Sequence, residues 1–301
     1  RPPILESVDI MAAVRDAANR RAFLAQVRRQ TGLKVRVLNG EDEARLAFRS
    51  ALAHFDLGVG RAVVMDIGGG SLEFAMSADG LVERLRSLPY GALRLSEEYF
   101  SVRPRRRQMR KLRAAIRDDI RKALPVSDWR GAQLIGSGGT FTNLGAVYLA
   151  RRELPFDGRV HGTRVPREDV EHILDMMLEA APEERAAIPG LNPARADIIL
   201  GGLAVVAEVM DRIEARELVI SGYGLREGIL LDAARVVPAP ADPGEARERS
   251  VRQFAERCHY EVPHAQHVKR LALQLFAALG HRLGCGPGDR QILADAALLH
   301  D

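Results

Sequence analysis

The chain has 301 residues, of which 47% are apolar and 28% are charged, and its formal net charge is +4. This composition supports a sizeable core and excludes a largely disordered chain, and the length allows two or three domains. The most apolar stretch, residues 198–210, is short and interrupted, so no membrane span is predicted. Cys258 and Cys285 lack metal-like spacing and no signal peptide is recognisable, so we expect a cytoplasmic protein with reduced thiols.

The expected elements alternate between helices and strands over most of the chain. Residues 1–55 predict a helix at 19–31, a strand at 34–38 and a helix from about 41. Residues 56–235 predict strands near 62–67, 71–77 and 217–220, and helices at 105–123, 141–151, 167–179 and 193–213. Residues 236–245 are rich in Pro and Ala and predict a linker, and residues 246–301 predict helices only. The fold class is therefore α/β, followed by an all-α part.

A glycine-rich turn framed by two acids is the most informative local pattern. Residues 63–73 contain a β-branched strand pattern, then a hairpin turn, with Asp66 before the turn and Glu73 after it. The turn residues suited to close on a phosphate are Gly68, Gly69, Gly70 and Ser71. Asp66 is placed to hold a hard cation, and Glu73 is a second acid in reach. A solvated hairpin is the alternative, but the two acids favour a phosphate and metal site.

A second glycine cluster follows the short apolar stretch 133–135 and precedes a helix start. Its residues are Gly136, Ser137, Gly138, Gly139 and Thr140. Glycines with hydroxyls before a helix N-terminus are typical of an anion site. No Gly-Lys-Ser/Thr follows, and the dinucleotide-binding fingerprint is absent too. Two separate strand–glycine turns instead favour a two-lobed, actin-like phosphotransferase fold, in which each lobe lends a hairpin to one phosphate chain.

Five motifs in register resemble the exopolyphosphatase/guanosine pentaphosphate phosphohydrolase family. They are residues 40–46 (GEDEARL), 66–73 (DIGGGSLE), 136–140 (GSGGT), 189–197 (PGL with RAD) and 221–228 (SGYGLREG). The resemblance spans residues 12 to about 232. It implies an actin-like ATPase-superfamily fold with ribonuclease H-like lobes. It also implies hydrolysis of a phosphoanhydride that depends on Mg²⁺ or Mn²⁺. The implied substrates are inorganic polyphosphate or guanosine pentaphosphate, and a homodimer is the expected assembly, with no membrane or nucleic-acid partner.

The resemblance assigns roles residue by residue. The family's catalytic glutamate falls on Glu43, its metal-binding acid on Asp66, and its second cleft acid on Glu73. We expect a helix to begin near Glu41, so an acid in its first turn is exposed at the interlobe cleft, ready to activate water. The alternative is that Glu41, Asp42 and Glu43 only complement the helix dipole.

Several charged residues have roles that the sequence leaves open. Arg45 either reaches a phosphate or pairs with a nearby acid on the helix surface, whereas Arg226 and Glu227 are expected to hold the lobe together. A basic run comprises Arg103, Arg105, Arg106, Arg107, Arg110, Lys111 and Arg113. The run is either a solvated helix face or a path that leads polyphosphate to the cleft. It lacks the aromatic interleaving typical of nucleic-acid binding.

The first and last segments of the sequence lead to two further expectations. The family has an early phosphate turn of the Asp-x-Gly-Ser-Asn-Ser type that this sequence lacks, so we expect an incomplete first lobe. The tail resembles the start of an HD-type domain, with His264, His300 and Asp301 as a possible second metal site and His267 as a rival first ligand. A capping or surface role for a lone histidine is the alternative.

Two classes of function remain open from the sequence. One is a hydrolase of phosphoanhydride chain ends, and the other is a non-catalytic sensor that binds a phosphorylated alarmone or polyphosphate through the same turns. Glu43, Asp66 and Glu73 together favour the hydrolase, because a binding module needs no base. A sugar or acetate kinase is a weaker third choice, since no sugar-binding acid is evident.

Overall fold

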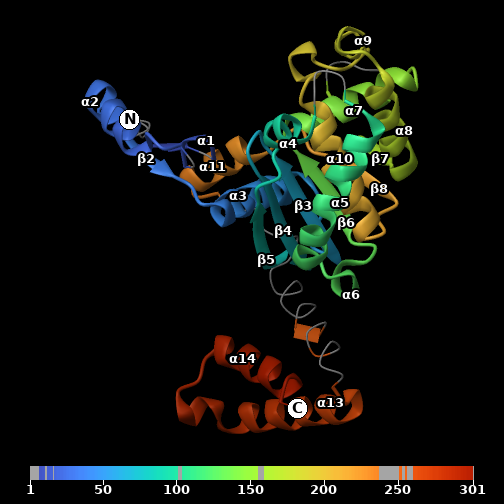
Figure 1. Cartoon of the computed structure of the whole chain (residues 1–301). Coiled ribbons are helices and arrows are strands. Elements are labelled where there is room, and N and C mark those ends of the chain that lie inside the picture. Colours follow the sequence, from blue (N-terminus) through green and yellow to red (C-terminus); the bar gives the residue numbers. More distant parts are fainter. Residues whose placement is uncertain are drawn as a thin grey trace.

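The computed structural model describes residues 7–10, 12–15, 17–100, 104–154, 159–236, 251–252, 255 and 260–300. Its main feature is a six-stranded mixed sheet covered by helices (Figure 1). A two-stranded parallel sheet lies near the N-terminus, and helices near the C-terminus form a hairpin (Figure 1). The α/β fold class predicted from the sequence is confirmed for the main part of the described chain.

The six-stranded sheet has the order β5-β4-β3-β6-β8-β7. Its strands are β3 (Arg61–Ile67), β4 (Leu72–Ala78), β5 (Leu81–Leu88), β6 (Gln133–Ser137), β7 (Arg164–Pro166) and β8 (Glu217–Ile220). The first three form an antiparallel meander, β6 and β8 run parallel to β3, and β7 closes the edge antiparallel to β8. This mixture places the ends of β3 and β6, with the turns that follow them, next to each other. Both glycine turns therefore belong to one sheet, so the expectation that each lobe lends one of them is wrong.

The helices begin and end as follows. Before the main sheet, β1 (Ser7–Ile10) and β2 (Lys34–Val37) accompany α1 (Ala12–Arg15), α2 (Arg20–Thr31) and α3 (Gly40–His54). The main part adds α4 (Ala92–Tyr99), α5 (Arg106–Ala123), α6 (Val126–Trp129), α7 (Gly139–Arg151), α8 (Arg167–Glu179), α9 (Pro182–Ala186), α10 (Ile199–Arg212) and α11 (Leu225–Ala233), with a 3₁₀ turn at Pro193–Arg195. The hairpin consists of α13 (Val262–Leu279) and α14 (Pro287–Leu298), joined by a 3₁₀ turn at Gly280–Leu283.

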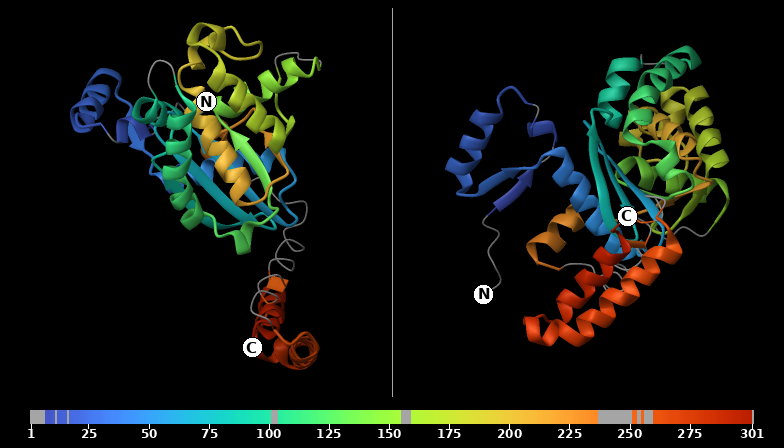
Figure 2. Two further views of the ribbon diagram at one scale, coloured as in Figure 1. Left: turned by 45° about the vertical axis from the view of Figure 1, so that its right-hand side comes forward. Right: turned by 90° about the horizontal axis from the view of Figure 1, so that it is seen from below.

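The two faces of the sheet are buried against different helices. Successive residues of β3 point to opposite faces. Val63 and Met65 therefore belong to the large core formed with α4, α5, α7, α8 and α10, whereas Val64 packs with Phe48 of α3 on the other face. Figure 2 shows α3 and α11 on one side of the sheet and the larger helical layer on the other. Burial on both faces explains why β3 is a continuous apolar run.

Most elements expected from the sequence are present, with shifts of one or two residues at their ends. Of the helix expected at 193–213 only the start is wrong, because the chain forms a 3₁₀ turn at Pro193–Arg195 and α10 begins at Ile199. The short apolar stretch before the second glycine cluster is β6, and β5, β7, α4, α9 and α11 were not expected. Apart from residue 236, the expected linker at 236–245 lies outside the described residues.

Arg185 of α9 accounts for the interruption near residue 196. Its guanidinium is buried, with 2% of the residue exposed, and donates to the carbonyls of Met177 (2.7 Å), Ala180 (3.0 Å) and Ala196 (3.3 Å). The first two carbonyls lie in the last turn of α8 and just beyond it, where helical partners are lacking. Because the third belongs to the 193–198 segment, one side chain ties that segment to α8.

We expect Arg185→Met to lower the free energy of unfolding by about 1–3 kcal/mol, because buried carbonyls lose their donors. Urea denaturation followed by circular dichroism provides the measurement. The control is Arg130→Met, which breaks an exposed pair with Glu214 and should cost at most about 1 kcal/mol. Equal losses in the two variants would contradict this account of Arg185.

Candidate functional site

The glycine turn between β3 and β4 is fixed by the N-terminus of α4. The carbonyl of Gly68 accepts from the amide of Ala92 (2.9 Å), and the carbonyl of Gly69 accepts from the amides of Leu93 and Arg94 (both 3.1 Å). In the described part of the chain, the amides of Gly69 and Gly70 have no hydrogen-bond partner. The turn therefore has its carbonyls occupied and its amides available for an anion.

A cavity of about 350 Å³ lies at this turn and brings the predicted acids together. Its lining comprises Glu43, Asp66, Gly68, Gly69, Gly70, Ser71, Glu73, Leu93, Arg94, Glu97 and Leu225. The catalytic acid, the two metal-binding acids and the first phosphate turn that were predicted from the sequence thus meet in one place. They come from α3, β3, β4 and the turn between the two strands.

Strand register determines how the acids face each other. Asp66 is opposite Glu73 in the β3–β4 pair and opposite Ser137 in the β3–β6 pair. Residues directly opposite each other in neighbouring strands have their side chains on the same face. The two carboxylates are therefore neighbours, and Ser137 hydrogen-bonds to Asp66 on its other side.

Both carboxyl groups bind protons more readily than usual. Burial raises the pKa of Glu73 to about 8, with the charges of Glu43 and Asp66 adding to the effect, while hydrogen bonds from Ser71 and Ser87 oppose it. The Ser87 hydroxyl donates to Oε1 of Glu73 at 2.9 Å. Burial also raises the pKa of Asp66, against the hydrogen bond from Ser137. A site that holds three acids in a buried position favours a bound cation.

Glu43 is buried rather than exposed at a cleft, so that part of the expectation is wrong. Only 4% of the residue is exposed, although its side chain lines the cavity. The reason is the close approach of α3 to β5, since a Cβ on Gly40 would lie 2.2 Å from the Cβ of Ser87. Arg15 of α1 forms an ion pair with Glu43 and donates to the carbonyl of Leu38 at 2.9 Å. This pair holds the acid at the cavity wall.

Glu41, Asp42 and Arg45 of this helix do not line the cavity. Asn39 caps α3 by accepting from the amide of Asp42 at 2.8 Å. Arg45 pairs with Asp42 at 3.1 Å, and both side chains are exposed. The structure therefore favours surface pairing for Arg45. Glu227 caps α11 by accepting from the amide of Gly224 at 2.9 Å, which fits the expected structural role.

The second glycine turn lies directly over Asp66. Gly138 has φ +99°, and a Cβ at this position would lie 2.8 Å from both Oδ1 of Asp66 and the carbonyl oxygen of Ile67. Only glycine fits there. A Cβ on Gly139 would lie 2.6 Å from the guanidinium of Arg195. Because α7 begins at Gly139, the amides of its first turn lack helical partners and can serve an anion beside this guanidinium.

The remaining residues of the second cluster support the turn. Gly136 lies inside β6, where a Cβ would lie 2.1 Å from the ring of Phe141, so its absent side chain provides packing space. Oγ of Ser137, beside Asp66, also lies 3.3 Å from the carbonyl oxygen of Met65. Thr140 is buried, and a Cβ on Gly202 would lie 2.4 Å from its hydroxyl. The side chains of Ser137 and Thr140 are therefore enclosed by neighbouring elements.

Sequence reasoning missed two arginines of this site. Arg94 lines the cavity from the first turn of α4, and the Gly91 that precedes this helix was the available signal. A Cβ on Gly91 would lie 2.3 Å from the backbone of Gly69 and Gly70, so glycine allows α4 to approach the turn. Arg195 belongs to a motif noted in the sequence, but its position beside the second turn depends on the 193–198 segment.

The part of the basic run from Arg106 to Arg113 lies on α5, which buries an apolar face that includes Met109 and Leu112. Arg106 pairs with Glu179, and Arg113 pairs with Glu171 (2.8 Å) and with Glu208 of α10 (2.6 Å). Other members are exposed, including Arg105, Arg107 and Arg110, and Arg103 lies outside the described residues. Part of the run is therefore neutralised by acids of neighbouring helices.

The C-terminal hairpin brings two predicted ligands together. Nε2 of His264 and Nε2 of His300 lie 3.2 Å apart, whereas His267 contacts Arg270 (2.6 Å). Asp301 lies outside the described residues. Within the described part of the chain, no three His, Cys, Asp or Glu side chains are arranged to hold a metal ion. The second metal site therefore stays a prediction, with His264 favoured over His267.

The fold and the site together suit an α/β protein that binds a phosphate-bearing ligand. A mixed sheet carries two strand–glycine turns that meet over a buried carboxylate, which is an arrangement suited to phosphate. No helix in the described part of the chain is long and apolar enough to cross a membrane.

The chain belongs to the Ppx/GppA phosphatase family, whose model matches residues 5–236. It is 32% identical over 228 residues to an uncharacterized protein of Streptomyces coelicolor, covering 73% of this chain and 66% of the relative. It is 30% identical over 255 residues to Exopolyphosphatase 1 of Mycobacterium leprae, covering 80% of this chain and 70% of the relative. The chain thus spans about two thirds of the length of these relatives.

A solved structure agrees with the family assignment. The Ppx/GppA family member of Aquifex aeolicus superposes with a TM-score of 0.66 at 28% identity, covering 75% of this chain and 73% of that one. This structural likeness confirms the actin-like fold that the sequence motifs imply.

The raised pKa values predict how stability depends on pH in the presence of a chelator. Between pH 4.5 and about 8, folded Glu73 retains a proton that the unfolded chain releases, so stability should fall as pH rises through this window. We expect the free energy of unfolding to drop by about 2–5 kcal/mol from pH 5 to pH 8. Urea denaturation with EDTA at both values measures it.

The matched variants for this experiment are Glu73→Gln and Glu41→Gln. The first should remove most of the drop, because the amide does not titrate, and the second should retain it, because Glu41 is exposed. A drop of the same size in Glu73→Gln and in the wild type would show that Glu73 is not its source.

Proposed function

We propose that the protein hydrolyses the terminal phosphate of a phosphoanhydride chain, with inorganic polyphosphate as a substrate and guanosine pentaphosphate as a second one. The observation that carries this proposal is the convergence of Glu43, Asp66 and Glu73 with the first glycine turn in one cavity. The similarity to a relative named Exopolyphosphatase 1 supports polyphosphate. Phosphoryl transfer requires mainly positioning and charge neutralisation, which these groups supply.

Each part of the site has a role in this proposal. The amides of Gly69 and Gly70 bind oxygens of the terminal phosphate, and the guanidinium of Arg94 neutralises charge at the same cavity. Glu43 accepts the proton of the attacking water, and Arg15 keeps its carboxylate in position. The water oxygen forms a bond to the terminal phosphorus as the bond to the bridging oxygen breaks. The shortened chain and phosphate then leave.

The residues at the turn fit a hard divalent cation such as Mg²⁺ or Mn²⁺. Asp66 and Glu73 are adjacent oxygen donors, and burial raises the pKa of both carboxyl groups in the absence of a cation. Mg²⁺ is commonly bound by one or two carboxylates together with phosphate oxygens and water. A bound cation supplies charge neutralisation at the phosphate chain.

We expect Glu43→Gln to lower turnover by a factor of about 10² to 10⁴, because the amide cannot accept a proton. Release of phosphate from tripolyphosphate in the presence of Mg²⁺ provides the measurement, and binding should change little. The control is Glu41→Gln on the same helix, whose side chain is exposed. A Glu43→Gln enzyme with more than half of the wild-type rate would rule out Glu43 as the base.

The exposed arginines of α5 are proposed as a path for long polyphosphate. Exchanging Arg107 and Arg110 for Ser should weaken binding of long chains more than of tripolyphosphate, by roughly two- to tenfold at low salt. KM values at several chain lengths and two salt concentrations provide the test. The control is Arg130→Ser, whose partner is Glu214. Equal effects at all chain lengths would leave the run as a solvated face.

A further inference from the structure

Asp197 of the RAD motif has no role in the mechanism above, and it lines a cavity that adjoins the catalytic one. This cavity lies between α4, Arg185 of α9 and residues 197–198, and its volume is about 400 Å³. Small-molecule sites typically have volumes of about 300–1,000 Å³. Leu93 and Glu97 of α4 line both cavities. A ligand held here would therefore lie next to the candidate active site.

The cavity has a cationic floor and an anionic mouth. Its charged lining residues are Arg185, Glu97 and Asp197. Only 2% of Arg185 is exposed, whereas the other two residues are exposed. In the part of the chain that the structure describes, none of the three forms an ion pair. Buried charges in proteins are normally paired, so the guanidinium at the floor lacks the anionic partner that its burial favours.

Arg185 keeps hydrogen-bond donors that a ligand can use. Its bonds to the carbonyls of Met177, Ala180 and Ala196 use one N–H group on each of its nitrogens, so Nη1 and Nη2 each retain another. Such a pair of donors suits a carboxylate. Burial lowers the pKa of Arg185, and the charge of Asp197 partly opposes this effect. The Asp197 carboxylate is therefore near the guanidinium without being paired to it.

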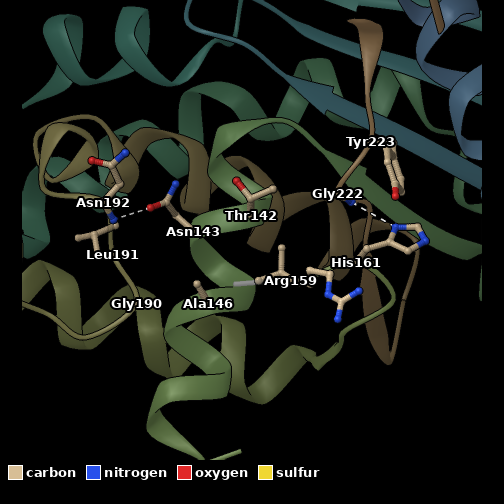
Figure 3. Close-up of a pocket in the computed structure, with 11 residues that line it drawn as sticks. Thr142, Asn143, Ala146, Arg159, His161, Gly190, Leu191, Asn192, Gly222 and Tyr223 are labelled. Carbon is tan, nitrogen blue, oxygen red and sulfur yellow. Dashed lines mark hydrogen bonds between the residues drawn. The ribbon is translucent and has the colours of Figure 1, made fainter. Parts of the chain in front are cut away.

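Hydrogen bonds hold the walls of this cavity in place. The Ser96 hydroxyl donates to the carbonyl of Ile198 at 3.2 Å, which links α4 to the 193–198 segment. Directly before this segment, the amide of Asn192 donates to Oδ1 of Asn143 at 2.7 Å (Figure 3). Asn192 also lines a larger cavity of about 570 Å³, which runs along α7 (Figure 3). Because the segment is anchored at both ends, the smaller cavity is formed before any ligand binds, as is usual for small-molecule sites.

The arrangement of charges suits a zwitterion better than a simple ion. A phosphate ion would be repelled by Glu97 and Asp197 at the mouth, and a metal cation would be repelled by Arg185 at the floor. An α-amino acid carries a carboxylate and an ammonium group on the same carbon atom. Its two charges therefore match a guanidinium and a carboxylate that are close together but not in contact.

The uncharged lining specifies the side chain of such a ligand. Apart from Ser96, the uncharged residues that line the cavity are Leu93, Phe100, Pro104 and Ile198. Leu93 is 44% exposed, so it has apolar surface to cover. An apolar wall with a few convergent charged groups is typical of small-molecule sites. An aliphatic side chain gains most from this wall, because its burial removes apolar surface from water.

We propose that this cavity binds a free α-amino acid with an aliphatic side chain, such as leucine. The ligand carboxylate accepts from Arg185, its ammonium group donates to Asp197, and its side chain packs against Leu93 and Phe100. The inference goes beyond the proposed function and does not depend on it. A bound amino acid stabilises the arrangement of α4 that it contacts, and the first amides of α4 hold the first glycine turn.

The test is isothermal titration calorimetry of the full chain with L-leucine and two analogues that each lack one charge. N-acetyl-L-leucine has no ammonium group and L-leucinamide has no carboxylate. Each should bind at least about tenfold more weakly than L-leucine, because one charge-assisted hydrogen bond is lost. The analogues replace Arg185→Met as the probe of the guanidinium, because that variant also loses hydrogen bonds that stabilise the fold.

A pair of matched variants locates the binding site. Asp197→Asn should weaken L-leucine by about tenfold, because the amide carries no charge for the ammonium group. The control is Asp175→Asn, which removes an exposed carboxylate of α8 outside the lining. It should bind L-leucine within about twofold of the wild type, because a distant exposed charge contributes little.

The outcomes decide for or against the amino-acid site without any measurement of catalysis. Weaker binding of both analogues, together with a loss in Asp197→Asn that Asp175→Asn does not share, supports it. The site is overturned if the wild type does not bind L-leucine at millimolar concentration or binds the three ligands equally well. Equal losses in the two variants also overturn it. Displacement of L-leucine by inorganic phosphate would show an anion site instead.

Discussion

The contact between the Asp66 carboxylate and the Gly138 backbone is the constraint on which the site depends. Asp66 sits in β3 with Glu73 on one side and Ser137 on the other, both in register. Any side chain at position 138 would lie 2.8 Å from Oδ1, and the residue also has a positive φ. Because the turn after β6 carries glycine at position 138, two turns far apart in the sequence contact one acid. The first turn, the second turn and the buried acids Asp66 and Glu73 are thereby placed together.

Asp66 and Glu73 are buried where the two turns meet, and their charged forms lower the stability of the folded protein when no cation is bound. Burial raises the pKa of Asp66 and of Glu73, so the folded protein without a cation disfavours their charged forms. Perturbed carboxyl groups in a cavity are typical of functional sites rather than of structural ion pairs. The structural ion pairs of this chain look different. Arg113 and Arg117 surround Glu208, and their hydrogen bonds lower the pKa of that buried acid despite its burial.

Local sequence was sufficient to predict the two glycine turns but not the packing of other elements around them. A β-branched strand followed by glycines specifies a hairpin with few alternatives, so the acids that frame it were predicted correctly as neighbours. The burial of Glu43 could not be predicted, because it arises from contact between Gly40 and Ser87, which belong to different elements. The break before α10 depends on hydrogen bonds from Arg185 to carbonyls of two separate segments. The spacing of apolar residues within 193–213 does not reveal these hydrogen bonds.

The same limitation applies to the larger cavity, whose walls come from four separate segments. Its lining residues lie on α7, at 159–161, at 190–192 and at 222–223, and no local pattern in the sequence marks these segments as neighbours.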